Sequence, residues 1–524
     1  MKKLNELSMC ELSATIRNKP NWWKKCKDPA IRAKWKEEAT TQRGSYECRP
    51  LQEDEIDYVL DELEGYATVR DPETGIETSC YRRIWRSDSL IESSLRESLI
   101  SSVASLEKVP DAEKDWHPRA NGQVLDLVHP SLYCIVYGRT LGWNADGSAT
   151  TLVSEGDNFD YTVSKRFSWL PTDFLISPDG NNAKSLGYIN NIHPTNDAAL
   201  HTVIETLVAR FTPLWSRVLV ESKEDYKLPL RTNDSYDWEP SECSFYQDHP
   251  APQTATDEDY DSDDQDAAWK DMRVMQYPRL LGAYKPGVLA FPEPMDLKGR
   301  KLQVIVKLAN ILLTPEKPVY EGGSWHVEGM KNESIVSTGI YYYDQENITQ
   351  SKLSFRVSVS EPDGYGESDS DGTAAVWGLD RDEPLHQNIG NVATKMGRCV
   401  AFPNMYQHCV SPFSLLDPSK PGYRKIVALF LVDPELESSR PSTTIVPPQR
   451  LDWWSRDLRD LANEGNSRLG RLPAELLDLV VDFMDLMRRK EAEELRLQLM
   501  DERTAFVREN NENMFNVTFN MCEH

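Results

Sequence analysis

Long hydrophobic segments are missing from this 524-residue sequence. A transmembrane helix needs about 20 consecutive apolar residues, and no stretch approaches that length. The first residues, MKKLNELSMCELSATIRNKPNWW, also lack the apolar core of a signal peptide. We therefore predict no membrane partner and a soluble protein of the cytoplasm, with the nucleus as the alternative compartment.

Paired cysteines are missing as well. The nine cysteines are scattered without a CxxC pair, which excludes the common paired-cysteine zinc and redox motifs. An odd number of cysteines in a chain of this length is typical of reduced thiols inside a cell. Neither a P-loop nor a GxGxxG or GxSxG motif occurs, so the sequence contains no sign of a nucleotide-binding or serine-hydrolase site.

Basic residues are scarce, because 59 Lys and Arg stand against 84 Asp and Glu, a formal net charge of −25. This balance argues against a protein that binds nucleic acid or anionic membranes. Two acidic runs, 253–267 and 361–371, carry part of the charge, and their low hydrophobicity predicts solvated surface loops, the first of them disordered. The alternative is that these acidic runs bind a basic partner.

Hydrophobic spacing divides the chain into three parts. Residues 1–115 and 451–524 show mainly helical spacing, whereas 116–450 is rich in short segments of branched and aromatic residues between Gly, Pro and Asp clusters. The β pattern is densest over 301–433, after one long helix predicted at 196–220. We therefore predict an α+β protein whose core is an antiparallel sandwich or jelly roll with helical segments at both ends.

A His-x-Glu pair lies in the β-rich region. If His326 and Glu328 are on a strand, both side chains point to one face, while Trp325 and Val327 point to the other. An imidazole and a carboxylate placed in this way can occupy two adjacent positions on one metal ion. His-x-Glu is also a frequent chance pattern, and alone it favours an ordinary hydrogen-bonded pair at a strand end.

A second segment strengthens the metal interpretation. His408 falls in a predicted strand after the turn at Pro403, and Arg424 begins the following strand. Arg424 shares a face with Ala428 and Phe430, which places a guanidinium on an otherwise apolar surface. A buried guanidinium needs a carboxylate partner, because an unpaired buried charge is costly.

Together these residues match the ligand set of one type of metal site. Two histidines and a carboxylate, His326, Glu328 and His408, can hold Fe(II) on three positions and leave three open. 2-Oxoglutarate can chelate two of the open positions, and its distal carboxylate then needs a planar two-point donor, which Arg424 supplies. We therefore predict a mononuclear iron site with 2-oxoglutarate as cosubstrate.

These residues resemble the ordered motifs of the prolyl-hydroxylase-like branch of the 2-oxoglutarate oxygenases. That branch has H-x-D, H-x-V-x-P-V and G-x-R on a double-stranded β-helix, a type of jelly roll. The matching segments here are His326-x-Glu328, His408-x-Val410-x-Pro412-Phe413, Gly422-x-Arg424 and the strand Ile340-Tyr-Tyr-Tyr-Asp. The resemblance implies a dioxygenase, most commonly a hydroxylase, acting on a small molecule or a protein side chain that the sequence does not identify. Glu328 departs from the usual Asp, which leaves the identity of the metal open.

The full length also resembles a fungal family known only as domain of unknown function 4246. The similar segments are Lys19-Pro-Asn-Trp-Trp, Asp126-Leu-Val-His-Pro-Ser-Leu-Tyr-Cys, Tyr188-Ile-Asn-Asn-Ile-His-Pro, Trp325-His-Val-Glu-Gly-Met, Ala401-Phe-Pro-Asn and the terminal Cys522-Glu-His. This resemblance implies a fungal source and a single evolutionary unit, in which the helical ends pack on the β core. It implies no activity, because the family has none assigned.

Other polar and aromatic residues have weaker patterns. Tyr341 and Tyr343 share one strand face while Tyr342 points to the other, and either face can meet 2-oxoglutarate or belong to the core. We predict Tyr341 and Tyr343 as cosubstrate-binding residues. His129 and His193, each followed by a proline, are expected to cap turns rather than to catalyse.

Two alternative functions are consistent with part of this interpretation. A cupin-like zinc or iron hydrolase or isomerase would use Arg424 to bind a substrate carboxylate. A catalytically degenerate scaffold would instead bind partners through its helical ends and acidic loops. Metal content separates these hypotheses from one another.

Overall fold

The computed structural model describes residues 1–154, 160–223, 230–233, 235–249, 262–366, 368–436, 440–463, 468 and 472–521. The terminal Cys522-Glu-His and most of the acidic run at 253–267 lie outside these residues. Within the described part, the end of each acidic run is helical rather than a loop. The two helices concerned are α8 (Ser262–Met272) and α9 (Ser370–Trp377).

The first part of the chain is mainly helical, as predicted. Asp28 caps the third helix, because its carboxylate accepts hydrogen bonds from the backbone N–H groups of Ala30 and Ile31. Pro29 follows the cap, where its missing N–H costs nothing. Two short strands, which the helical spacing did not reveal, interrupt this part. The elements are α1 (Leu4–Arg17), α2 (Trp22–Lys25), α3 (Pro29–Thr41), α4 (Glu53–Val69), β1 (Glu77–Thr78), β2 (Trp85–Ser87) and α5 (Ser93–Glu107).

The main sheet has nine antiparallel strands. Its order is β1-β2-β17-β14-β20-β12-β8-β9, and β3 also pairs with β12. Strands from both ends of the β-rich region therefore meet in one sheet. The strands that follow β2 are β3 (Val124–Val128), β8 (Thr172–Ile176), β9 (Ala183–Ser185), β12 (Lys301–Leu313), β14 (Ile335–Glu346), β17 (Cys399–Pro403) and β20 (Gly422–Val432).

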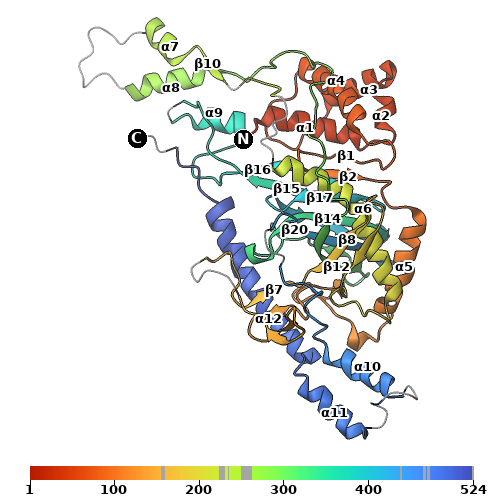
Figure 1. The fold of residues 1–524 in the computed structure, drawn as a ribbon. Helices are drawn as coiled ribbons and strands as arrows, with labels where there is room; N and C mark the ends of the chain where they lie inside the picture. The colour runs from red at the N-terminus through yellow and green to blue at the C-terminus, as the bar shows by residue number, and fades with distance from the viewer. Residues whose placement is uncertain are drawn as a thin grey trace.

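One face of this sheet is covered by the long helix α6 (Ala198–Lys223), close to the predicted 196–220 (Figure 1). Phe211 and Trp215 of α6 join Val306 and Leu429 of the sheet in a single buried cluster. A Cβ atom at Gly339 would lie 2.6 Å from the Phe211 ring, so the glycine allows α6 to approach β14 closely. Burial of this apolar face is the main driving force for the packing.

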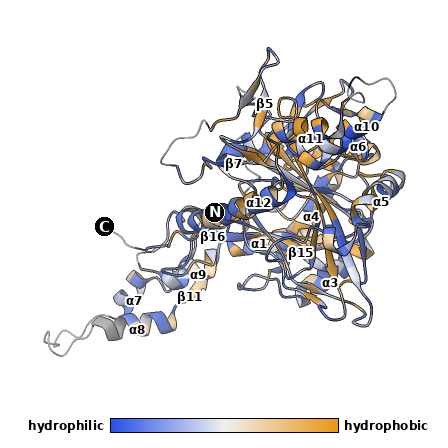
Figure 2. Cartoon of the chain, turned by 90° about the horizontal axis from the view of Figure 1, so that it is seen from below, coloured by the Kyte–Doolittle hydropathy of each residue, from blue (hydrophilic) through white to orange (hydrophobic). Residues whose placement is uncertain are grey.

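A three-stranded sheet, β16-β15-β18, packs against the opposite face. Phe355 and Val392 of this sheet share a buried cluster with Ile305 and Phe430 of the main sheet. Figure 2 shows hydrophobic strands at the centre of the molecule, with helices around them. The site described below belongs to this interior. The strands are β15 (Ser351–Ser358), β16 (His386–Thr394) and β18 (Gln407–Val410).

The C-terminal part returns to helix, as predicted. Ala492 and Leu499 of the last long helix join the interior cluster, and Arg496 forms an ion pair of 2.8 Å with Asp115. These helices are α10 (Leu451–Asn463), α11 (Ala474–Phe483) and α12 (Arg489–Asn510).

Smaller elements lie outside the two sheets. One is helix α7 (Glu242–Asp248), and the others are two-stranded ladders. The ladders pair β4 (Ile135–Val136) with β7 (Phe167–Ser168), β5 (Leu141–Trp143) with β6 (Ala149–Thr151), β10 (Asp237–Glu239) with β11 (Val274–Gln276), and β13 (Val319–Tyr320) with β19 (Phe413–Ser414).

The architecture is thus a mixture of helices and antiparallel sheets, which confirms the α+β prediction. The helical ends pack on the β strands, because α1 and α12 both contribute side chains to the interior cluster. Among the residues that the structure describes, no helix has the length and apolar character that crossing a membrane requires.

Candidate metal centre

His326, Glu328 and His408 meet beside the three-stranded sheet. His408 lies within β18, as predicted, and exchanges two backbone hydrogen bonds of 3.3 and 3.0 Å with His326. The prediction of a strand through both His326 and Glu328 is wrong, because only His326 forms a β-bridge and the chain bends at Glu328. The bend still turns the carboxylate toward the two imidazoles.

The ligand atoms of these three residues converge. The Nε2 atoms of His326 and His408 lie 3.5 and 3.3 Å from Oε1 of Glu328, and one ligand atom from each residue lies within 4.8 Å of the others. Two ligands bound about 2.1 Å from one metal ion are themselves roughly 3 Å apart. The three side chains therefore form a group that a single metal ion can fit with small adjustments.

The outer hydrogen bond of His326 favours metal binding. Its Nδ1 lies 2.8 Å from the carbonyl oxygen of Ser324, which can only accept, so Nδ1 carries a proton. The ring nitrogen that faces Glu328 is then Nε2, and this nitrogen can bind either a proton or a metal ion. A histidine fixed in this way by a backbone carbonyl is the usual arrangement of metal ligands.

Asn404 fixes the backbone of Glu328. Its side chain accepts a hydrogen bond of 2.8 Å from the Glu328 N–H and donates one of 2.8 Å to the Glu328 carbonyl. It also donates to the carbonyl of Ile335, at the start of β14. This positioning residue was not singled out from the sequence, since a lone Asn after a strand is an ordinary turn residue.

The three side chains differ in charge. Burial raises the pKa of Glu328, but the hydrogen bonds and charges of both histidines outweigh it and hold the pKa well below its ordinary value. Burial lowers the pKa of His326, and the Glu328 carboxylate overcomes this and raises it. For His408, burial and the nearby His326 charge lower the pKa. In the metal-free group, Glu328 therefore stays ionised to lower pH than an ordinary carboxyl group, and His326 keeps its proton to higher pH than His408.

Arg424 lies on the interior face of β20, where it is 1% exposed. Its Nη1 donates a 2.6 Å hydrogen bond to Ser351, while Nε and Nη2 are buried without a hydrogen-bond partner among the described residues. The expected protein carboxylate is missing from the described part of the chain around it. Burial lowers the pKa of Arg424. Two free donors on one edge of a guanidinium suit a carboxylate from a bound molecule.

Aromatic rings surround this guanidinium. The centroids of Phe413 and Tyr342 lie 4.2 and 5.9 Å from the Arg424 Cζ atom, and the tilted ring of Tyr320 lies beside Phe413, with 5.2 Å between the ring centroids. The sequence analysis named Phe413 only as part of the His408 motif, and it did not single out Ser351 or Tyr320, because the three residues come from three strands that only the fold brings together. The Phe413 and Tyr342 rings give the buried Arg424 guanidinium aromatic neighbours.

The structure corrects the prediction for Tyr341 and Tyr343. Both are almost fully buried in the cluster under α6, on the face of β14 opposite Arg424. The Tyr343 hydroxyl donates to Asn310 at 3.4 Å. Tyr342 is the tyrosine that turns toward Arg424, because alternate residues of a strand point to opposite faces.

The two His-Pro histidines both cap turns, as expected. Nδ1 of His193 accepts backbone N–H groups of Thr195 and Asn196, and Nδ1 of His129 accepts that of Ser131. His129 also belongs to a second group of side chains, with His117 and Asp126, that the sequence did not reveal. The residues of that group are nine and three positions apart along the chain, and this spacing matches no common ligand motif.

Comparison with known proteins gives a family but no activity. The model of the family described as "Protein of unknown function (DUF4246)" matches residues 53–457, and the model of its N-terminal domain matches residues 1–38. No curated protein matches the chain. The predicted family is thereby confirmed, whereas the fungal source stays a prediction.

Solved structures show only distant likenesses. The chain is similar to the Fe(II)/(alpha)ketoglutarate-dependent dioxygenase TqaL, with 11% identity over 52% of this chain and 70% of that chain and a TM-score of 0.23. It is also similar to a bsmA homolog from Methylobium petroleophilum PM1, with 9% identity over 68% and 90% of the two chains and a TM-score of 0.26. Likenesses at these scores carry no argument, so the function has to be argued from the site itself.

Proposed function

The chain belongs to the DUF4246 family, and we propose that it is a non-haem Fe(II), 2-oxoglutarate-dependent oxygenase, a hydroxylase of a small molecule or a protein side chain. One observation carries the proposal: two imidazoles and a carboxylate converge in the same interior that holds a buried guanidinium with two free donors. Each feature leaves buried polar atoms without a hydrogen-bond partner among the described residues, namely His408 Nδ1 and Arg424 Nε and Nη2, and such atoms call for an explanation.

The donor set fits the implied metal. His326, Glu328 and His408 would bind it through two ring nitrogens and one carboxylate oxygen, the ligand types of the facial triad of non-haem iron oxygenases. His326 is the most open of the three, with 34% of its side chain exposed, so one side of the group is accessible to small molecules. Iron(II) bound there would activate dioxygen for insertion into a substrate C–H bond.

Arg424 would bind the distal carboxylate of 2-oxoglutarate. Its free Nε and Nη2 atoms would donate to the two carboxylate oxygens, while Ser351 holds Nη1. Phe413 and Tyr342 exclude water from the guanidinium, which strengthens the charge pair. The chain thus supplies an anchor for each end of a five-carbon keto diacid.

We assign the finer architecture on the same basis. The two facing sheets would be a double-stranded β-helix, a jelly roll, with the metal ligands between them. The catalytic domain would span 116–450, with helical segments 1–115 and 451–524 at its ends. Asn404, which fixes the Glu328 backbone, would be a positioning residue of this domain.

A zinc hydrolase is the second candidate. Two histidines with a glutamate, rather than an aspartate, are also the ligand set of several catalytic zinc sites. In such an enzyme Arg424 would bind a carboxylate of the substrate. The distinction lies in the metal and in the response to 2-oxoglutarate.

Anaerobic spectroscopy tests the proposed function. Metal-free protein is mixed with Fe(II) and then with 2-oxoglutarate, and we expect a visible metal-to-ligand charge-transfer band that appears only with both. Tight zinc binding without such a band would contradict the oxygenase and support the hydrolase. Failure to bind any metal at this group would support a catalytically degenerate scaffold.

The protonation of His326 predicts a pH dependence of metal binding. Below its raised pKa, His326 carries a proton in the metal-free protein, and a metal must displace that proton. Glu328 is already ionised and His408 already neutral, so one proton is released per metal. We expect the affinity for Fe(II) or Mn(II) to fall by roughly tenfold per pH unit below the His326 pKa and to be constant above it. Anaerobic titrations between pH 5.5 and 8.5 measure this, and a flat profile would contradict the assignment.

A further inference from the structure

A second group of potential metal ligands lies where β3 joins the main sheet. Asp126 belongs to β3 and pairs with Ala309 of β12, while His117 precedes the strand and His129 follows it. Backbone hydrogen bonds of 2.9 Å tie His117 to Val124 and Asp126 to Asp115. The backbone at His117 and Asp126 is therefore held in place before any ligand is bound.

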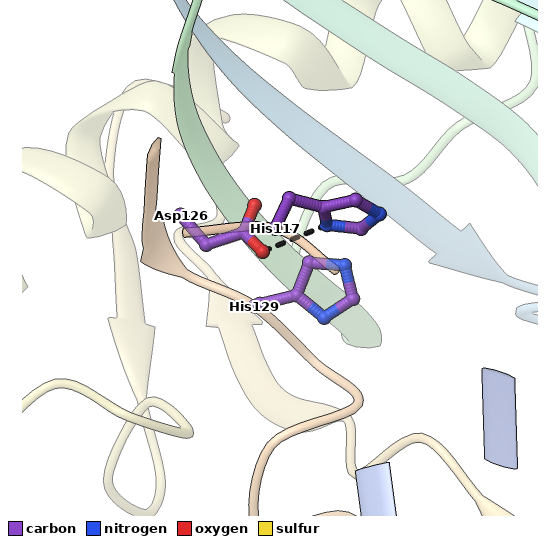
Figure 3. A group of neighbouring side chains, drawn as sticks. All are labelled: His117, Asp126 and His129. Atoms are coloured by element: carbon purple, nitrogen blue, oxygen red, sulfur yellow. Dashed lines mark hydrogen bonds and ion pairs between the residues drawn. The ribbon is translucent and has the colours of Figure 1, made fainter. Parts of the chain in front are cut away.

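The ligand atoms of this group also converge. One atom from each of His117, Asp126 and His129 lies within 4.8 Å of the others. Nδ1 of His117 is 2.8 Å from Oδ2 of Asp126, and the two ring centroids are 5.1 Å apart (Figure 3). Figure 3 shows both imidazoles on the same side of the carboxylate, with a ring nitrogen of His117 turned toward it and a ring nitrogen of His129 turned toward the His117 ring.

The Asp126 carboxylate is incompletely satisfied. Its side chain is 0% exposed, and Oδ1 has no hydrogen-bond partner among the described residues. The described part of the chain places no Lys or Arg within ion-pair distance of it, and His117 is the ion-pair partner it has. The Lys307 charge acts on Asp126 only from beyond ion-pair distance. A buried carboxylate that lacks a full positive charge in direct contact is costly, and a divalent cation between the three side chains would supply that charge.

The ring protons show what binding would change. Nδ1 of His129 accepts a hydrogen bond of 3.2 Å from the Ser131 N–H, so Nε2 carries the proton in the metal-free protein. A metal bound at Nε2 would move this proton to Nδ1 and break that bond. The bond is long for an N–H donor, and three metal–ligand bonds would replace it. On His117 the proton would move to Nε2, and 23% exposure of that side chain brings it near solvent.

We propose that His117, Asp126 and His129 bind a divalent transition-metal ion of the zinc class. The set of two nitrogens and one oxygen leaves a fourth position for water on the partly exposed side of His117. Bound metal would fasten the segment before β3 to the segment after it. The proposal is independent of the oxygenase function, because it uses none of the same residues.

Metal stoichiometry tests it. Metal-free, full-length protein is loaded with Zn(II) or Co(II) and desalted, and the retained metal is measured by mass spectrometry. We expect two equivalents in the wild type, one in H129A and in D126N, one in H408A, and none in H129A/H408A. The His193→Ala variant changes the other buried His-Pro histidine and should retain both equivalents. Cobalt at the second group should add the strong visible absorption of four-coordinate Co(II).

One outcome overturns the proposal: a wild type with a single equivalent that H408A removes and H129A leaves unchanged. Asp126→Asn preserves the shape of the side chain, so its circular dichroism and melting temperature separate ligand loss from misfolding. The two proposals fail separately. The band from Fe(II) and 2-oxoglutarate should persist in H129A, and the second equivalent should persist in H408A whatever the first group binds.

Discussion

The variant His408→Ala should lose metal from the first group, with the affinity for Fe(II) falling by more than about 100-fold. Removal of an outer-sphere partner alone costs about 10- to 100-fold in metal affinity, and His408 would be a direct ligand. It is also the most buried of the three ligands, so water would replace it poorly. Anaerobic Fe(II) titration gives the affinity, and the band that depends on 2-oxoglutarate should disappear with it.

His386→Ala is the matched control for this experiment. His386 lies in β16 of the same three-stranded sheet and bonds through Nδ1 to the Phe515 carbonyl, outside the convergent group. It should bind Fe(II) as the wild type does. If His408→Ala kept its Fe(II) affinity while remaining folded, the metal centre would have to be abandoned.

The second large effect is expected for Arg424→Met and 2-oxoglutarate. Loss of one partner of a buried, hydrogen-bonded charge pair costs about 2–5 kcal/mol. The dissociation constant of 2-oxoglutarate should therefore rise roughly 30-fold or more, since about 1.4 kcal/mol corresponds to a factor of ten. Anaerobic titration of the charge-transfer band measures it. Iron binding itself should be unchanged, because Arg424 is not a ligand.

A cosubstrate analogue makes the test specific. 2-Oxobutyrate keeps the keto acid but lacks the distal carboxylate, so its affinity should be the same in the wild type and in Arg424→Met. Arg424→Lys should recover only part of the affinity for 2-oxoglutarate, because an ammonium cannot make the two-point contact. Tyr343→Phe, on the opposite face of β14, is the neutral control. Equal losses for both keto acids would mean that Arg424 supports the fold rather than the distal carboxylate.

The sequence alone determined the residue types of the centre and their order. His326, Glu328, His408 and Arg424 were identified from their spacing, and the structure brings the first three together. The helical ends and the antiparallel strands followed from hydrophobic periodicity, because periods of 3.6 and two residues reflect which positions are buried. A local pattern suffices to predict a helix or a strand, because the burial pattern within one element depends on residues close together in the chain.

Only the tertiary structure shows which strand face meets Arg424 and which side chains complete each group. Periodicity places Tyr341 and Tyr343 on one face and Tyr342 on the other, but both faces of β14 are apolar because α6 covers one and the smaller sheet the other. No sequence signal separates two buried faces. Likewise, Ser351 of β15 reaches Arg424 of β20 only because the smaller sheet packs against the main sheet, and His117 reaches Asp126 only because the segment before β3 folds back beside that strand. These two contacts depend on how strands and sheets are arranged in space, and the spacing of residues along one strand does not specify that arrangement.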